Sequence, residues 1–299
     1  MVRQYRIHTD LDGSENKIYD MTNGLIRFYQ PSDLGLVIGT NIWQSQGIGV
    51  LGNSNIVHPD IEFSFETFGE SLEENYRIFN TFINDILAKR YVTLEYTNEI
   101  GTYYADVQMS KITKTEGYGF NGTFSESIAF TPITMWYVYE QLKFSKVQNG
   151  EIGDTTKIHT VSKYTYDYSY HGEDDIERFS KWKIEDGIFS FTARVIPSAV
   201  PTTEPTPSGR NDYGIRFLDK DFNEYTAIMF SNATKPESIQ FNTDVNDEYY
   251  QAQIGTTTVN VFSALNYQRF RTRLIQKGTM ELINVDMVEM NVKRKVEFV

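Results

Sequence analysis

The sequence predicts a mainly β protein of two domains, the first of which carries one long helix. Three observations support this class: 20 Tyr and 20 Phe give an aromatic content of 14%, many short segments alternate apolar and polar residues, and one segment has a helical stripe. Aromatic and β-branched residues favour strands, and period-two alternation is typical of a strand with one buried face. At 299 residues the chain can form two domains, each with its own core.

Composition and charge argue against several classes of protein. With 40% apolar and 23% charged residues the chain is expected to fold, and its net charge of -12 does not suit a protein that grips DNA phosphates. No stretch approaches the ~18 to 20 apolar residues of a membrane span, and the first eight residues lack the apolar core of a secretory signal. The absence of Cys excludes disulfides and fits folding in a reducing cytoplasm.

The first ~130 residues read as strands around one helix, which we predict from Ser71 to Arg90. Ser71 and Glu74 form a capping box, and Lys89 and Arg90 are expected in the last turn, where cations are favoured. The predicted apolar stripe, with spacings of four, three, four, three and one, comprises Leu72, Tyr76, Phe79, Ile83, Ile86 and Leu87.

Alternation predicts the strands on either side of this helix. They are 61–66, 91–96, 103–109 and 123–130, with a Gly-rich turn at 116–122 between the last two. A domain boundary is predicted at 131–145, where Thr131-Pro132 and a run of aromatic residues follow.

The second region again consists of short alternating segments, which favour a sandwich or barrel. Strands are predicted at 189–195, 214–217, 225–230, 239–241, 258–262 and 288–298. A Pro- and Thr-rich loop is predicted between 196 and 212.

Motifs that carry chemistry are absent or lack the right context. Gly47-Ile-Gly49-Val-Leu-Gly52 matches a dinucleotide-binding pattern, but the residues that follow have no helical period, so we interpret it as a flexible Gly-rich loop. Asp10-Leu-Asp12-Gly13 is interpreted as a hairpin turn. The four histidines have no metal-ligand spacing. We therefore predict no catalytic residues, no cofactor and no metal.

The most unusual segment places Tyr164, Tyr166, Tyr168 and Tyr170 on one face of a predicted strand. Three interpretations stay open: a core-facing strand, a face that docks another protein, and a face that stacks on carbohydrate. The adjacent acidic segment 171–175 suits a solvated turn better than a divalent cation site.

Long stretches of the chain are similar to the distal tail proteins of siphophages, in particular those of phages that infect lactococci. The strongest stretches are Arg6 to Leu36, Asn41 to Gly52 (NIWQSQGIGVLG), Glu66 to Leu87, Thr113 to Ser127 (TKTEGYGFNGTFSES), Gly214 to Ile228 (GIRFLDKDFNEYTAI), Phe241 to Gln251 and Tyr267 to Val285. Residues 150–209 match least well.

The resemblance implies a non-enzymatic hub of the tail tip, in the virion. An N-terminal domain of residues 1–132 plus 281–299 would form a six-membered ring around the tail channel, and the final strand would return to it. Residues 133–280 would form a galectin-like β-sandwich, with an arm and hand extension within about 145–188.

The implied partners are the chain itself, the receptor-binding protein, the major tail protein and a tail-associated lysin or fibre. The extension, where the tyrosine row lies, would hold the receptor-binding protein. DNA would pass through the channel without sequence-specific binding, and no membrane partner is expected. The alternatives are a carbohydrate-binding module, which needs an exposed aromatic beside convergent polar groups, and a wall-degrading enzyme, which needs paired acidic residues in a cleft.

Overall fold

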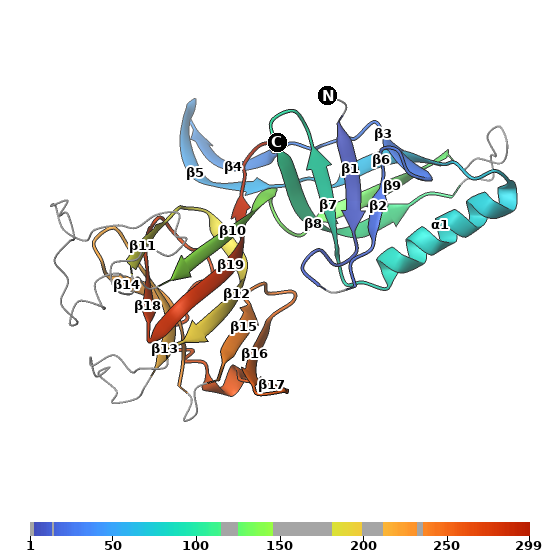
Figure 1. The fold of residues 1–299 in the computed structure, drawn as a ribbon. Helices are drawn as coiled ribbons and strands as arrows, with labels where there is room; N and C mark the ends of the chain where they lie inside the picture. Colours follow the sequence, from blue (N-terminus) through green and yellow to red (C-terminus); the bar gives the residue numbers. More distant parts are fainter. Residues whose placement is uncertain (1–2, 14, 115–124, 146–180, 199–211, 232–235) are drawn as a thin grey trace. The chain divides into compact units, whose positions relative to one another are not determined.

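The chain folds into two compact units, residues 1–138 with 295–299, and residues 139–294. The computed structural model describes residues 3–13, 15–114, 125–145, 181–198, 212–231 and 236–299. Within these residues the regular structure is almost all strand, with one α-helix (Figure 1). The prediction of a mainly β fold with a single long helix is confirmed.

The first unit is built around β8 (Thr102–Ile112), which pairs with strands on both sides. Its other elements are β1 (Gln4–His8), β2 (Ile18–Asp20), β3 (Ile26–Tyr29), β4 (Val37–Ser45), β5 (Ile48–Val57), β6 (Ile61–Thr67), α1 (Leu72–Leu87), β7 (Val92–Thr97), β9 (Ser125–Pro132) and the start of β10 (Tyr137–Ser145). One row of strands runs β2-β1-β7-β8 and a second runs β8-β9-β6-β3, while β4 and β5 form a separate hairpin. The pairing of β8 with β9 contains a register shift between Met109 and Lys111.

Aromatic rings fill the core of the first unit. Phe63 of β6 stacks on Phe28 of β3 with ring centroids 4.7 Å apart, and it meets Tyr5 of β1 edge-on at 5.3 Å. These three side chains, with Phe130 of β9, are buried. Strands from both rows therefore contribute to one core. Because every second residue of such a strand points into this core, the alternation of aromatic and polar residues predicts the strands correctly.

Helix α1 begins where the capping box predicts. Ser71 is the N-cap and its Oγ accepts a hydrogen bond from the Glu74 N–H at 3.2 Å. The Glu74 carboxylate in turn accepts from the Glu70 N–H at 2.7 Å. The helix ends at Leu87, earlier than predicted, so Lys89 lies beyond the last turn and forms an ion pair with Asp10 at 3.4 Å.

The buried face of α1 is rotated from the predicted stripe. Phe82, which the stripe omits, is fully buried and packs edge-on against Tyr19 of β2 at 5.1 Å. Ile86 is buried as predicted, whereas Leu72 and Leu87 are exposed. The helix meets the unit with positions 75, 79, 82 and 86, a spacing of four, three and four.

The second unit is a sandwich of two sheets. Its further elements are β11 (Lys181–Ile184), β12 (Ile188–Pro197), β13 (Tyr213–Leu218), β14 (Glu224–Phe230), β15 (Ser238–Asn242), β16 (Tyr249–Ile254), β17 (Thr257–Asn260), a 3₁₀ turn (Phe262–Ala264), β18 (Gly278–Ile283) and β19 (Val285–Lys295). One sheet has the order β17-β16-β15-β12-β19-β10 and the other β11-β18-β13-β14. Rings from the two sheets meet between them, for example Phe191 with Phe217 at 6.1 Å and Phe230 with Phe241 at 5.9 Å.

The edge of β14 is covered by the segment between β17 and β18. The Asn266 N–H donates to the Met229 carbonyl at 2.8 Å, and the Ala227 N–H donates to the Arg269 carbonyl at 3.0 Å. Arg269 also binds Glu224 through two of its nitrogens. These bonds occupy an edge that would otherwise be open to pairing with another chain.

Three predictions about organisation need correction. Residues 281–294, predicted in the first domain, lie in the second unit, because β18 and β19 are central strands of its two sheets and only 295–299 return. Residues 181–184, which fall in the stretch of about 145–188 where the extension was expected, belong to the sandwich, because β11 pairs with β18. The predicted strand 258–262 ends at Asn260.

The Gly-rich motif at 47–52 is not a loop but the turn and start of β5. Gln46 and Gly47 have φ values of 50° and 82°, the positive pair that a two-residue hairpin turn requires. The motif leads into a strand, so it has no helix N-terminus that could bind a pyrophosphate. The turn predicted at Asp10 to Gly13 does join the paired strands β1 and β2.

Candidate interaction surfaces

The β4–β5 hairpin exposes a continuous apolar surface. Figure 1 shows the two strands as a ribbon that extends beyond the rest of the first unit. Every residue of β4 is exposed, and Trp43 and Leu51 are each 70% exposed. The exposed apolar side chains of the hairpin are Val37, Ile38, Ile42, Trp43, Ile48, Val50, Leu51, Ile56 and Val57.

Both faces of this ribbon are apolar. Directly paired residues of an antiparallel hairpin share a face, and neighbours in sequence lie on opposite faces. Ile42 pairs with Leu51 on one face, and Trp43 pairs with Val50 on the other. A strand with one buried face would alternate apolar and polar residues, so this ribbon is suited to burial on both sides, as in an assembly.

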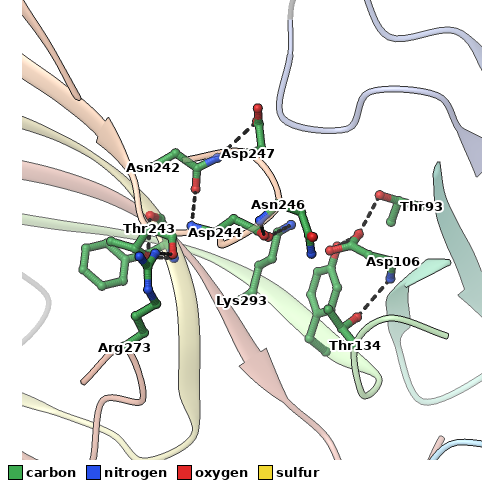
Figure 2. A network of polar contacts seen from close by, with 12 residues as sticks. Thr93, Asp106, Thr134, Asn242, Thr243, Asp244, Asn246, Asp247, Arg273 and Lys293 are labelled. Carbon is green, nitrogen blue, oxygen red and sulfur yellow. Dashed lines mark hydrogen bonds and ion pairs between the residues drawn. The ribbon is translucent and has the colours of Figure 1, made fainter. Parts of the chain in front are cut away.

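A buried carboxylate organises polar side chains in the first unit (Figure 2). Asp106 of β8 accepts hydrogen bonds from the hydroxyls of Thr93 and Tyr137, each at 2.8 Å. Its backbone N–H donates to Thr134 Oγ1 at 3.0 Å. These bonds fix the connection between β9 and β10, so the network acts as a structural support.

The second unit contains a buried ion pair between Lys293 of β19 and Asp244, with Nζ and Oδ2 3.2 Å apart (Figure 2). The Asp244 carboxylate is oriented by its own loop, because its Oδ1 accepts from the Asn246 N–H and its N–H donates to Asn242 Oδ1, both at 2.9 Å. Arg273 anchors the same loop by donating to the Thr243 carbonyl. Figure 2 shows these side chains converging on the loop after β15.

A second buried carboxylate, Glu95 of β7, contacts two basic side chains of β1. It lies 2.7 Å from His8 and 2.9 Å from Arg6. Burial alone raises the pKa of Glu95, but the hydrogen bond and charge of His8 and the charge of Arg6 outweigh it and lower the pKa below its ordinary value. The pairing favours an ionised structural group that links β1 to β7, not a proton donor.

The residues that the sequence analysis singled out for binding cannot be placed. Tyr164, Tyr166, Tyr168, Tyr170 and the acidic segment 171–175 lie outside the described residues. Among the residues that the structure does describe, no group of three or more His, Asp or Glu side chains could hold a metal ion. Within the same residues no helix is both long and apolar enough to cross a bilayer.

The hairpin surface was missed by the sequence analysis, although it has a sequence signal. Apolar residues on both sides of the Gln46-Gly47 turn have no polar alternation, and the glycines of the 47–52 motif suggested a loop. The pair Gln46-Gly47 lies between two apolar segments, one that contains Trp43 and one that begins at Ile48. This arrangement would have indicated a two-residue hairpin.

Two family models together match almost the whole chain. The family model "Distal tail protein, N-terminal domain" matches residues 4–133, and the model "Dit, C-terminal domain" matches residues 135–299. The distal tail proteins of Lactococcus phage p2 and Lactococcus phage SK1 are each 52% identical to this chain over 307 residues, and the matches cover 100% of both chains.

Solved structures agree with this assignment. A chain of the phage p2 baseplate in its activated conformation with Ca has a TM-score of 0.81 and 51% identity, and one from the form with Sr has a TM-score of 0.82, both with 100% coverage of each chain. The Dit protein of SPP1, described as a hub of the adsorption apparatus, shares the fold at a TM-score of 0.52, with 11% identity and 98% of this chain covered.

The chain therefore belongs to the distal tail protein family. It is a structural component of a phage baseplate, located in the virion, and it assembles with other baseplate components.

Proposed function

We propose that six copies of this chain form a closed ring around the tail channel, and that the ring connects the tail tube to the tip and carries the receptor-binding proteins. The observation that carries the ring is the two-faced apolar hairpin β4–β5. A closed ring uses heterologous contacts, in which one surface of each copy meets a different surface of the next. A projecting hairpin that lies on the neighbouring copy is a contact of this kind.

The free energy of burying these side chains favours a permanent contact between copies of the chain. Burial of one exposed Ile, Leu or Val side chain contributes about 1.5–3 kcal/mol, and the hairpin offers several such side chains besides Trp43. Obligate interfaces bury about 2,000–5,000 Å² and are more apolar than transient ones. The hairpin surface therefore supports an assembly that does not dissociate during the life of the particle.

The receptor-binding protein is proposed to attach through the segment between β10 and β11, which includes the row from Tyr164 to Tyr170. Aromatic anchors are the side chains that most often dominate a protein interface. The major tail protein and a tail-associated lysin or fibre are the proposed neighbours above and below the ring. The net charge of -12 supports a channel that repels passing DNA, with neither nucleic-acid nor membrane binding.

We also propose that the chain is not an enzyme. The buried carboxylates Asp106, Glu95 and Asp244 are each held by hydroxyls or cations of the fold, and these partners support a structural role for them. Nothing in the ring proposal requires a chemical step.

Deletion of residues 157–175 tests the attachment and the ring together. The shortened chain is expected to keep the molar mass of the ring, because the hairpin is intact, and to lose capture of the purified receptor-binding protein by at least about 100-fold in Kd. Light scattering and surface plasmon resonance measure the two quantities.

A deletion of residues 200–208, between β12 and β13, is the matched control and should preserve capture. Capture that survives the first deletion would refute the attachment site. A monomeric product of either deletion would refute the hairpin as a sufficient ring contact.

A further inference from the structure

Two aromatic side chains of the second unit are exposed together, on the segment that follows β17. Phe262 and Tyr267 are each 46% exposed, and their rings meet edge-on with centroids 4.9 Å apart. Phe262 also lies 5.7 Å from Tyr250, which is buried and stacks on Phe241. The exposed pair is therefore a continuation of the sandwich core to the surface.

The backbone holds this pair in a fixed orientation. The Phe262 N–H donates to Asn260 Oδ1 at 2.9 Å, and Phe262 begins a 3₁₀ turn. The Ser231 N–H donates to the Ala264 carbonyl at 2.9 Å, so the turn is tied to the end of β14. An aromatic surface that is already ordered loses little conformational entropy when a ligand binds.

An ion pair with a well-defined geometry lies beside the two rings. Glu248 accepts from the Tyr250 hydroxyl at 2.9 Å and from Arg273 Nη2 at 2.7 Å. The Arg273 guanidinium lies 5.2 Å from the centroid of the Phe270 ring and also donates to the Thr243 carbonyl. Both charged side chains are about one quarter exposed, so each can still reach a ligand.

The ion pair and the exposed tyrosine belong to the same surface. Partial burial raises the pKa of Tyr267, the charge of Glu248 raises it further, and the charge of Arg273 acts in the opposite direction. Contacts connect the same groups, because the Phe262 ring meets those of both Tyr250 and Tyr267, and the Tyr250 hydroxyl donates to Glu248. The surface defined by Phe262, Tyr267, Glu248 and Arg273 therefore combines an apolar platform with hydrogen-bonding groups, and its two charges cancel.

We infer that this surface binds a neutral pyranose sugar. A pyranose has one apolar C–H face, which suits a flat aromatic side chain, and a rim of hydroxyls that both donate and accept. The Glu248 carboxylate accepts from such hydroxyls, and the Arg273 N–H groups donate to them. This function adds to the ring without depending on it.

Size distinguishes a sugar from a protein partner. An aromatic side chain has about 150–250 Å² of surface, so two half-exposed rings offer on the order of 200 Å². That area covers one sugar ring but is well below the about 800 Å² per partner of a stable protein interface. The aromatic rings lie on one part of this surface and the ion pair on another, an arrangement that suits a small ligand with one apolar and one polar side.

Saturation-transfer NMR of the full assembled chain tests this site, with the methyl glycosides of β-glucose, β-galactose, N-acetyl-β-glucosamine and α-rhamnose as probes. At least one glycoside is expected to bind saturably with a Kd on the order of 1 mM. Tyr267→Ala and Glu248→Gln should each weaken binding about tenfold or more, whereas Tyr267→Phe, which keeps the ring, should retain most of it.

Phe222→Ala is the matched control, because Phe222 is also half exposed in the same unit but lies in the turn between β13 and β14. It should leave binding unchanged. Absence of saturable binding for all four glycosides, undiminished binding by Tyr267→Ala, or an equal loss in Phe222→Ala would overturn the site. Molar mass measured on the same samples separates this result from the ring, since a sugar-binding failure in an intact ring contradicts the site alone.

Discussion

Replacing Ile42 and Leu51 together by serine is expected to convert the ring into monomers while both units stay folded. The two side chains form one cross-strand pair on one face of the β4–β5 hairpin and are 53% and 70% exposed. In the ring they would be buried, so each replacement removes about 1.5–3 kcal/mol from every subunit contact. The combined loss weakens each contact by about 10² to 10⁴-fold. Light scattering at micromolar protein concentration measures the change in molar mass.

The control for this experiment is Ile100→Ser in the turn between β7 and β8 of the same unit. Ile100 is 86% exposed and lies outside the hairpin, so its replacement should leave the molar mass unchanged. Circular dichroism should show the same strand and helix content in all variants, because the replaced side chains make little contact within one subunit. A ring that survives the double replacement would show that the hairpin is not the contact.

Replacing Lys293 by methionine is expected to destabilise the second unit by about 3–5 kcal/mol. Methionine preserves most of the side-chain volume, but it leaves the Asp244 carboxylate buried without its cation. Both side chains are less than 10% exposed, so water cannot replace the lost partner. Urea denaturation, followed by the fluorescence of Trp182 in chains with the other two tryptophans replaced by phenylalanine, measures the free energy of unfolding of this unit.

Two comparisons separate the buried charge from other effects. Lys277→Met removes an exposed partner, whose Nζ lies 3.7 Å from Glu185 in the same unit, and should change stability by less than about 0.5 kcal/mol. Adding Asp244→Asn to Lys293→Met removes the buried charge and should recover part of the loss. Equal effects of Lys277→Met and Lys293→Met would contradict the role assigned to the buried pair.

Local patterns predicted local structure well in this chain. The capping box placed the start of α1 at the correct residue, and alternation placed β6, β7, β8 and β12 to β15. These features depend on neighbours in the sequence, such as the bond from the Glu74 N–H to Ser71. Periodicity could not fix the helix face, because Phe82 and Ile83 are both apolar and only packing against Tyr19 and Phe28 selects the first.

Features that depend on contacts between residues far apart in the sequence could not be predicted from local patterns. The last strand alternates along its length, but nothing in its sequence says that β19 lies between β10 and β12 in the second unit. The hairpin surface was overlooked because apolar side chains lie on both of its faces, which gives no alternation of apolar and polar residues. The Phe262–Tyr267 surface combines residues from separate segments, as does its ion pair from Glu248 to Arg273.

The molar mass of the unmodified chain in solution tests the central claim most directly. Light scattering across a hundredfold dilution should give six times the subunit mass of 34.6 kDa at every concentration, because the proposed ring would bury the hairpin surface in a permanent contact. A constant mass of 34.6 kDa, with the hairpin amides exchanging as fast as those of an unpaired strand, would contradict it.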